Sequence, residues 1–251
     1  NISADKAANA TSPAWTTLGN IVISEGANAD FANQSGVTLI LTAPAGWTFN
    51  TASGTVSFAG SANISSASLA VASGTITVTY TCGGTNKADV LTISGIQVQA
   101  SDGANVSGSG NILRTSGNPG TGTIAGITNG TTNFGSLSQT FGAMTKLVVT
   151  LPTQTFTDGT TVASSGNSGS VSNQTSGTSF NLAKLTACDQ FFNIVTSYSG
   201  TKTISYSGPS NGVTAPNYTT SVSFTSGQST TTIATTLKKA ETTTITASDG
   251  T

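Results

Sequence analysis

The chain has 251 residues, a formal net charge of -1 and no histidine, and only 7% of its residues are charged. Without histidine it lacks the usual general base and the commonest metal ligand, so Ser-His and Cys-His catalysis and His-zinc sites are excluded. Lys and Arg together number only eight and are mostly scattered, so no nucleic-acid partner is expected. The composition predicts a folded, polar, nearly neutral protein that is not an enzyme.

No apolar run approaches the roughly 20 residues that a membrane-spanning helix needs, so we expect no membrane insertion in this segment. The chain begins at Asn1 without an initiator methionine or a signal peptide, and it stops at Thr251 just after an expected strand. We therefore expect an excerpt from a longer, secreted chain.

Alternation of apolar and polar residues dominates the first half. In residues 74–81 the apolar side chains take the even positions and threonine the odd ones, which is typical of a strand with one buried and one solvated face. The apolar parity changes across Ser94-Gly95, which predicts a β-bulge there. The other expected strands are residues 21–24, 37–42, 55–58, 68–72 and 90–99, with weaker signals at 111–114 and 123–127.

A linker is expected near residues 141–144, where a second series of strands begins. The expected strands are residues 146–151, 178–187, 191–198, 201–207, 219–225, 229–237 and 242–247. Seven strands in about 100 residues is the count of an immunoglobulin-like sandwich. We therefore predict an all-β protein with two tandem antiparallel β-sandwich domains, residues 1–142 and 143–251, the second immunoglobulin-like.

The second half resembles a known family. The runs QTSGTSFNL at 174–182, LTACD at 185–189 and SYSG at 197–200, with Asn193 between them, are similar to immunoglobulin-like repeats of large bacterial surface proteins and adhesins. The run KAETTTITA at 239–247 resembles the last strand of such repeats. Phe192, where glycine is usual, and Cys188 depart from the pattern. The resemblance covers residues 145–251 and implies an extracellular location on a bacterial cell surface.

The first half resembles cohesin-like β-sandwich modules of secreted bacterial proteins. The residues that carry this likeness are LILTAPAGWTF at 39–49 and DVLTISGI at 89–96. A jelly-roll-like sandwich is the alternative. No binding activity is carried over from the resemblance.

Two oxygen-rich turns are candidate calcium sites, because calcium prefers oxygen ligands on loops. One turn contains Glu25 and Asp30, and the other contains Asp189 and Asn193. The alternative is that these side chains accept local backbone hydrogen bonds, as in an Asx turn. No other cofactor is expected.

Aromatic residues and cysteines leave further alternatives open. Trp15 and Trp47 are candidates for stacking on sugar rings, unless they pack in cores. Tyr198 is a candidate corner tyrosine whose hydroxyl ties down a loop. Cys82 and Cys188 fall in different predicted domains, where they form either a disulfide or two unpaired thiols.

The expected function is a structural and adhesive segment of a secreted bacterial surface protein. The chain would be a repeated element of an extracellular fibre, stalk or coat, with other copies or neighbouring domains as partners. One alternative is a carbohydrate-binding module of a secreted multidomain protein, with glycans as partners. Another is a filament-forming or surface-layer subunit.

Overall fold

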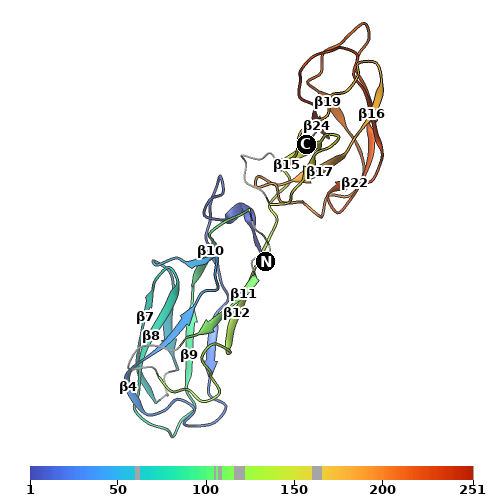
Figure 1. Ribbon diagram of the computed structural model, residues 1–251. Coiled ribbons are helices and arrows are strands. Elements are labelled where there is room, and N and C mark those ends of the chain that lie inside the picture. The colour runs from blue at the N-terminus through green and yellow to red at the C-terminus, as the bar shows by residue number, and fades with distance from the viewer. Residues whose placement is uncertain (60–62, 105, 107–108, 116–121, 160–165, 251) are drawn as a thin grey trace. The chain divides into compact units, whose positions relative to one another are not determined.

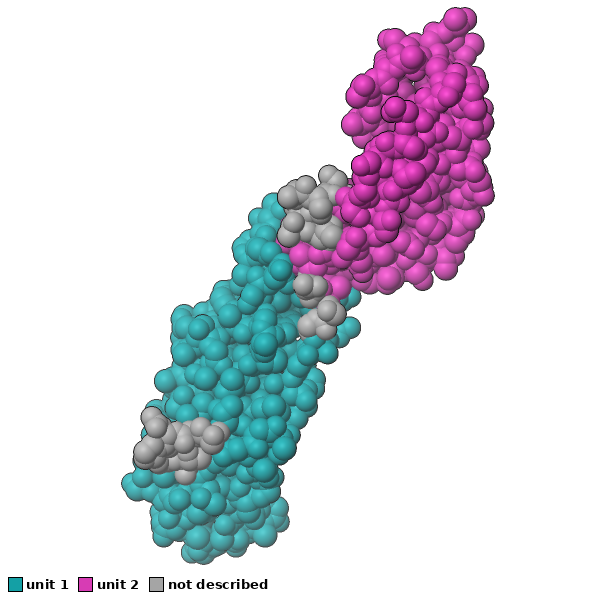
Figure 2. All heavy atoms as spheres, viewed as in Figure 1, with its two compact units in different colours: residues 1–102, 107–140 teal, residues 103–106, 141–251 magenta. Residues whose placement is uncertain are grey.

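The computed structural model describes residues 1–59, 63–104, 106, 109–115, 122–159 and 166–250 (Figure 1). The protein is all-β, as predicted; the helix found among these residues is a single 3-10 turn, η1 (Ala4–Lys6). No helix of the described ranges is long and apolar enough to cross a membrane. The chain forms two compact units (Figure 2), unit 1 with residues 1–102 and 107–140 and unit 2 with residues 103–106 and 141–251.

Unit 1 has a six-stranded sheet and two three-stranded sheets. The six-stranded sheet has the order β1 (Ile2–Ser3), β12 (Asn133–Thr140), β11 (Ser109–Arg114), β4 (Gln34–Thr42), β8 (Thr75–Cys82), β7 (Ile64–Val71). The smaller sheets are β2 (Thr16–Thr17), β10 (Gln97–Ala100), β5 (Trp47–Phe49) and β3 (Ile21–Ser24), β9 (Val90–Ser94), β6 (Thr55–Phe58). Strands β1 and β12 pair in parallel, and the other pairings described in this unit are antiparallel.

The core of unit 1 follows from the alternation that the sequence shows. In β8 the side chains of Ile76, Val78 and Tyr80 are at most 1% exposed, whereas the threonines between them are partly exposed. Tyr80 packs edge-on against Phe31, with 5.6 Å between ring centroids. Because side chains alternate between the two faces of a strand, this apolar row determines which face of the sheet packs against the core.

Two expectations for unit 1 are wrong. The expected strand 90–99 does not contain a bulge but divides into β9 and β10, which belong to different sheets. Gly95 lies between them with a φ of 68°, a left-handed conformation that glycine adopts without a steric penalty. The weak signal at 123–127 is not a strand: Ile124 makes one isolated bridge to Phe31 and a turn follows.

Unit 2 has a seven-stranded, a three-stranded and a two-stranded sheet in a sandwich-like arrangement. The largest has the order β18 (Gly200–Thr203), β21 (Ser221–Thr225), β22 (Gln228–Ser229), β17 (Lys184–Cys188), β13 (Lys146–Thr150), β24 (Thr246–Ser248), β19 (Ser205–Ser207). The others are β16 (Ser179–Leu182), β23 (Ile233–Thr236), β20 (Asn217–Tyr218) and the pair β14 (Thr155–Phe156), β15 (Asn167–Ser168). Apolar side chains from both larger sheets form one core cluster, with Leu185, Val222 and Ile233 at its centre.

Several long strands expected in unit 2 are interrupted. The expected strand 178–187 breaks at Ala183 into β16 and β17, which lie in different sheets, and 201–207 breaks at Ile204 into β18 and β19. Of the expected strand 242–247, only the end pairs, as part of β24. Residues 191–198 form turns and one isolated bridge, because local backbone donors there bond to a carboxylate.

Candidate functional site

The Asp189 carboxylate organises the turn after β17. Asp189 is 0% exposed. Its Oδ1 accepts hydrogen bonds from the backbone N–H groups of Phe191 (2.9 Å) and Asn193 (3.0 Å). Its Oδ2 accepts from the backbone N–H of Gly142 (2.7 Å) and from Asn193 Nδ2 (2.8 Å), while Asn193 Nδ2 also donates to the Gly103 carbonyl (2.7 Å). The structure therefore brings the predicted pair Asp189 and Asn193 together as a buried hydrogen-bond centre, with each carboxylate oxygen accepting two donors.

The Glu25 and Asp30 carboxylates also accept backbone donors. Glu25 Oε1 accepts from Phe31 N and its Oε2 from Asp89 N, both at 2.6 Å. Asp30 Oδ2 accepts from Gly26 N (2.9 Å) and Ala27 N (3.0 Å). Both turns thus show the backbone bonding of the Asx-turn alternative. In the part of the chain that is described, no three Cys, Asp or Glu residues gather in a way that could hold a metal ion.

Asp89 is a buried acid that the sequence did not single out. It is 1% exposed, and its Oδ1 accepts from Asn63 N (2.6 Å) and Ile64 N (3.1 Å). The Cys82 thiol donates to its Oδ2 at 3.8 Å. These partners lie 7 to 26 residues away in sequence, so no local motif could have shown the contact.

The two tryptophans have different environments. Trp47 lies in β5 and is 5% exposed, as part of the unit 1 core. The prediction that it stacks on sugar rings is therefore wrong, because its face is covered by protein. Trp15 is 40% exposed and keeps a surface on which a ring could stack.

Both cysteines are free, buried thiols, Cys82 in unit 1 and Cys188 in unit 2. Burial raises the pKa of Cys82, and it raises the pKa of Cys188 to about 12. Both thiols are therefore protonated and unreactive at neutral pH.

The hydroxyl of Tyr198, the expected corner tyrosine, donates to Asp249 Oδ2 at 2.6 Å.

One face of unit 1 consists mainly of hydroxyl-bearing side chains, with the apolar Ile40 and Ala70 on either side of Thr77. Strands β4, β8 and β7 lie side by side (Figure 1) and contain no charged residue. On their outer side, Thr79 lies between Thr38 of β4 and Ser68 of β7. We call this surface the hydroxyl face; its members are Thr38, Thr42, Ser66, Ser68, Thr75, Thr77, Thr79 and Thr81.

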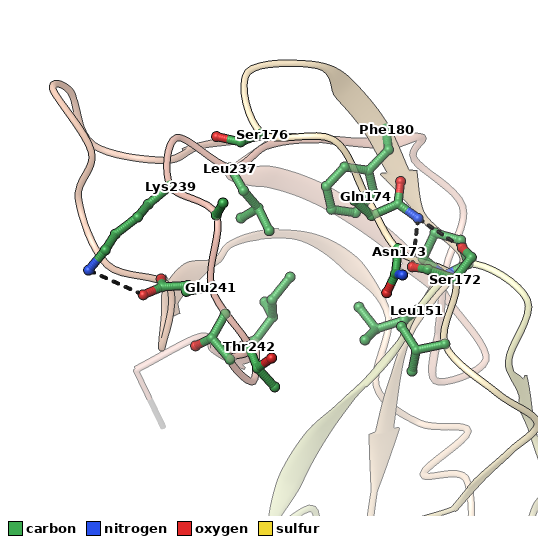
Figure 3. A pocket seen from close by; sticks show the side chains of 15 residues that line it. Leu151, Ser172, Asn173, Gln174, Ser176, Phe180, Leu237, Lys239, Glu241 and Thr242 are labelled. Atoms are coloured by element: carbon green, nitrogen blue, oxygen red, sulfur yellow. Dashed lines mark hydrogen bonds and ion pairs between the residues drawn. The ribbon is translucent and has the colours of Figure 1, made fainter.

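Unit 2 contains a groove of about 500 Å³ (Figure 3). Four of its apolar side chains come from β16 or from residues next to strand ends. Phe180 belongs to β16, Leu237 follows β23, Leu151 follows β13 and Ile245 precedes β24. Because β16 and β23 belong to one sheet and β13 and β24 to another, the groove lies at a margin where the two layers are not closed over the core.

The charges that line this groove are paired with each other. Lys239 Nζ lies 3.5 Å from Glu241 Oε2, at one side of the groove (Figure 3). The backbone N–H of Ser210 donates to Glu241 Oε1 at 2.6 Å. This bond, more than Lys239, lowers the pKa of Glu241. The remaining lining residues are uncharged, so the groove favours an uncharged ligand.

Comparisons with protein-family models, with curated proteins and with solved structures give no match to this chain.

Proposed function

We propose that this chain is a structural and adhesive segment of a secreted bacterial surface protein, and that it associates with other copies or neighbouring domains through its hydroxyl face. The single observation that carries the proposal is the absence of charge from β4, β7 and β8, whose outer side presents rows of threonine and serine. The likeness of residues 174–200 to immunoglobulin-like repeats of bacterial adhesins supports the extracellular location and an immunoglobulin-like second unit.

A hydroxyl face is complementary to itself. Each hydroxyl both donates and accepts a hydrogen bond, so two identical faces can pair without opposite charges. The chain already contains such pairs between its own hydroxyl groups. The oxygens of Thr42 and Thr115 lie 2.9 Å apart, and those of Thr55 and Ser94 lie 3.0 Å apart.

Light scattering of the native chain across a range of ionic strength tests this proposal. We expect association that salt hardly weakens, since few ion pairs are present to be screened. The variant Thr77→Lys/Thr79→Lys places like charges on both copies of the face and should raise the dissociation constant by about tenfold or more. Thr51→Lys, in an exposed turn of the same unit, is the matched control. A chain that stays monomeric at all concentrations, or equal behaviour of the two variants, would contradict the proposal.

A second candidate function is carbohydrate binding, which the 40% exposure of Trp15 favours. Exposed tryptophan rings stack on the apolar faces of sugars. Titration of polysaccharide fragments should then quench the fluorescence of Trp15, and Trp15→Ala should abolish the response. Unchanged fluorescence with every glycan tested would exclude this function for Trp15.

A further inference from the structure

We propose that the groove of unit 2 binds an extended, uncharged peptide segment of a partner chain, one that carries apolar side chains at every second position. This inference concerns a different surface from the hydroxyl face and does not depend on association through that face.

The floor of the groove is an incompletely covered part of the core. Leu151, Phe180 and Ile245 pack against the buried cluster of unit 2 but remain only partly buried themselves. Val171, on the rim, is 50% exposed. Apolar side chains that enter the groove would complete this burial, and the removal of apolar surface from water favours binding.

The form of the groove fits an extended chain. Its rims are residues 171–176 and 239–243, which lie outside the strands that the structure describes. Strand β16, which supplies Phe180, stands at the end of its sheet and has β23 as its one neighbour in residues 166–250. A peptide that lies along such margins can form backbone hydrogen bonds while alternate side chains enter the apolar floor, as in recognition by strand addition.

The residues of the expected strand 242–247 that precede β24 also lie at this groove. Residues 242–247 alternate threonine with apolar residues toward their end, yet pairing is confined to β24. Thr242, Thr243 and Ile245 instead line the groove. The chain thus has strand-forming residues beside an uncovered apolar floor, and an added strand would supply their partner.

The lack of net charge in the groove favours uncharged peptides over charged ones. Lys239 and Glu241 neutralise each other, and every other lining residue is uncharged. A charged side chain that enters this space would lose hydration without gaining an opposite charge. The fitting ligand is therefore a segment of uncharged residues with alternating apolar side chains.

Fluorescence anisotropy with labelled synthetic peptides and the full chain tests the inference. The probe is SGTITVTYT, an uncharged alternating peptide with the sequence of residues 73–81; in the control peptide, lysine replaces its isoleucine and valine. We expect saturable binding of the probe and binding of the control weaker by about tenfold or more. Failure of the probe to bind, or equal binding of both peptides, would overturn the inference.

Two variants locate the site. Val171→Lys should weaken binding of the probe by about tenfold or more, because it places a hydrated cation at the apolar rim. Val213→Lys is the matched control, since Val213 belongs to the same unit, is not among the residues that line the groove and is 104% exposed. Protection of Cys188 from alkylation verifies that both variants fold. Equal binding by the two folded variants would overturn the site, whereas light scattering of the same variants reports separately on association through the hydroxyl face.

Discussion

Replacing Asp189 by alanine should destabilise unit 2 strongly. The substitution leaves three buried backbone N–H groups and Asn193 Nδ2 without their carboxylate acceptor. Each donor that loses a partner costs about 1–3 kcal/mol, and the effects are not additive. Hydrogen bonds to a charged acceptor contribute about 1.5–3 kcal/mol each, and removing the carboxylate also removes the cost of burying its charge, which offsets part of the loss. We therefore expect the free energy of unfolding of unit 2 to fall by about 3–5 kcal/mol.

Asp189→Asn separates the contributions of the two carboxylate oxygens. If the retained oxygen takes the place of Oδ1, the donors Phe191 N and Asn193 N keep their acceptor. The new amide nitrogen then faces two other donors, Gly142 N and Asn193 Nδ2. The free energy of unfolding should fall by about 2–3 kcal/mol, which is less than the loss expected for Asp189→Ala.

The two buried thiols provide the assay. Pulse alkylation in increasing urea, followed by mass spectrometry, reports unfolding around Cys82 and Cys188 separately. With a urea dependence of about 1–3 kcal/mol/M, a loss of about 3–5 kcal/mol in Asp189→Ala should lower the midpoint for Cys188 by roughly 1–5 M and leave the midpoint for Cys82 unchanged. Asp30→Ala, which removes only two exposed turn bonds, should cost less than about 1 kcal/mol. A loss below about 1 kcal/mol for Asp189→Ala, or an equal shift at both cysteines, would refute the reasoning.

Two further predictions concern the aromatic residues. The pKa of each of the four tyrosines is raised, mainly by burial, to about 12 for Tyr80 and Tyr206. Because folding favours the neutral phenol, its stabilising contribution is complete below the unfolded pKa of about 10 and is lost as the pH rises toward 12. Phenolate absorbance and circular dichroism should therefore change together in that range, and ionisation of native tyrosines below it would contradict the prediction. Trp47→Ala should lower the free energy of unfolding by about 3–5 kcal/mol and Trp15→Ala by less than about 1 kcal/mol, as measured by urea denaturation; equal losses would contradict the burial difference.

The sequence predicts strands well where the alternation is continuous. Residues 21–24 and 55–58 form β3 and β6 with the expected bounds, and the threonine alternation of 75–81 lies entirely within β8. It fails where a strand is interrupted without a change in composition, whether the chain enters another sheet, as at Ala183, or another position in the same sheet, as at Ile204. Ala183 and Ile204 interrupt β-prone runs, and neither residue disfavours a strand, so only the tertiary packing determines these breaks.

The hydrogen-bonded carboxylates of the turns could be predicted only in part. Asp189 and Asn193 are four residues apart, and their proximity was visible as an oxygen-rich turn. The contact between Glu25 and Asp89 spans 64 residues, and that between Asp189 and Gly142 spans 47. In both cases the partner is a backbone N–H, which every residue except proline has. Such contacts leave no signature in residue identity, so the sequence could indicate acids in turns but not which acids are buried.

The buried charges bear directly on what the surface can recognise. The chain has eight basic and nine acidic residues, and of these Asp89, Asp189 and Arg114 are at most 4% exposed. Arg114 donates to the carbonyls of Ile127 and Gly122, so its charge is used inside unit 1. These three charges are therefore not available at the surface of a chain that already has few charged residues. Since charge is the usual means of preventing contact between exposed strands and faces, the placement of these residues is consistent with our proposals that the hydroxyl face and the uncovered apolar groove recognise partners.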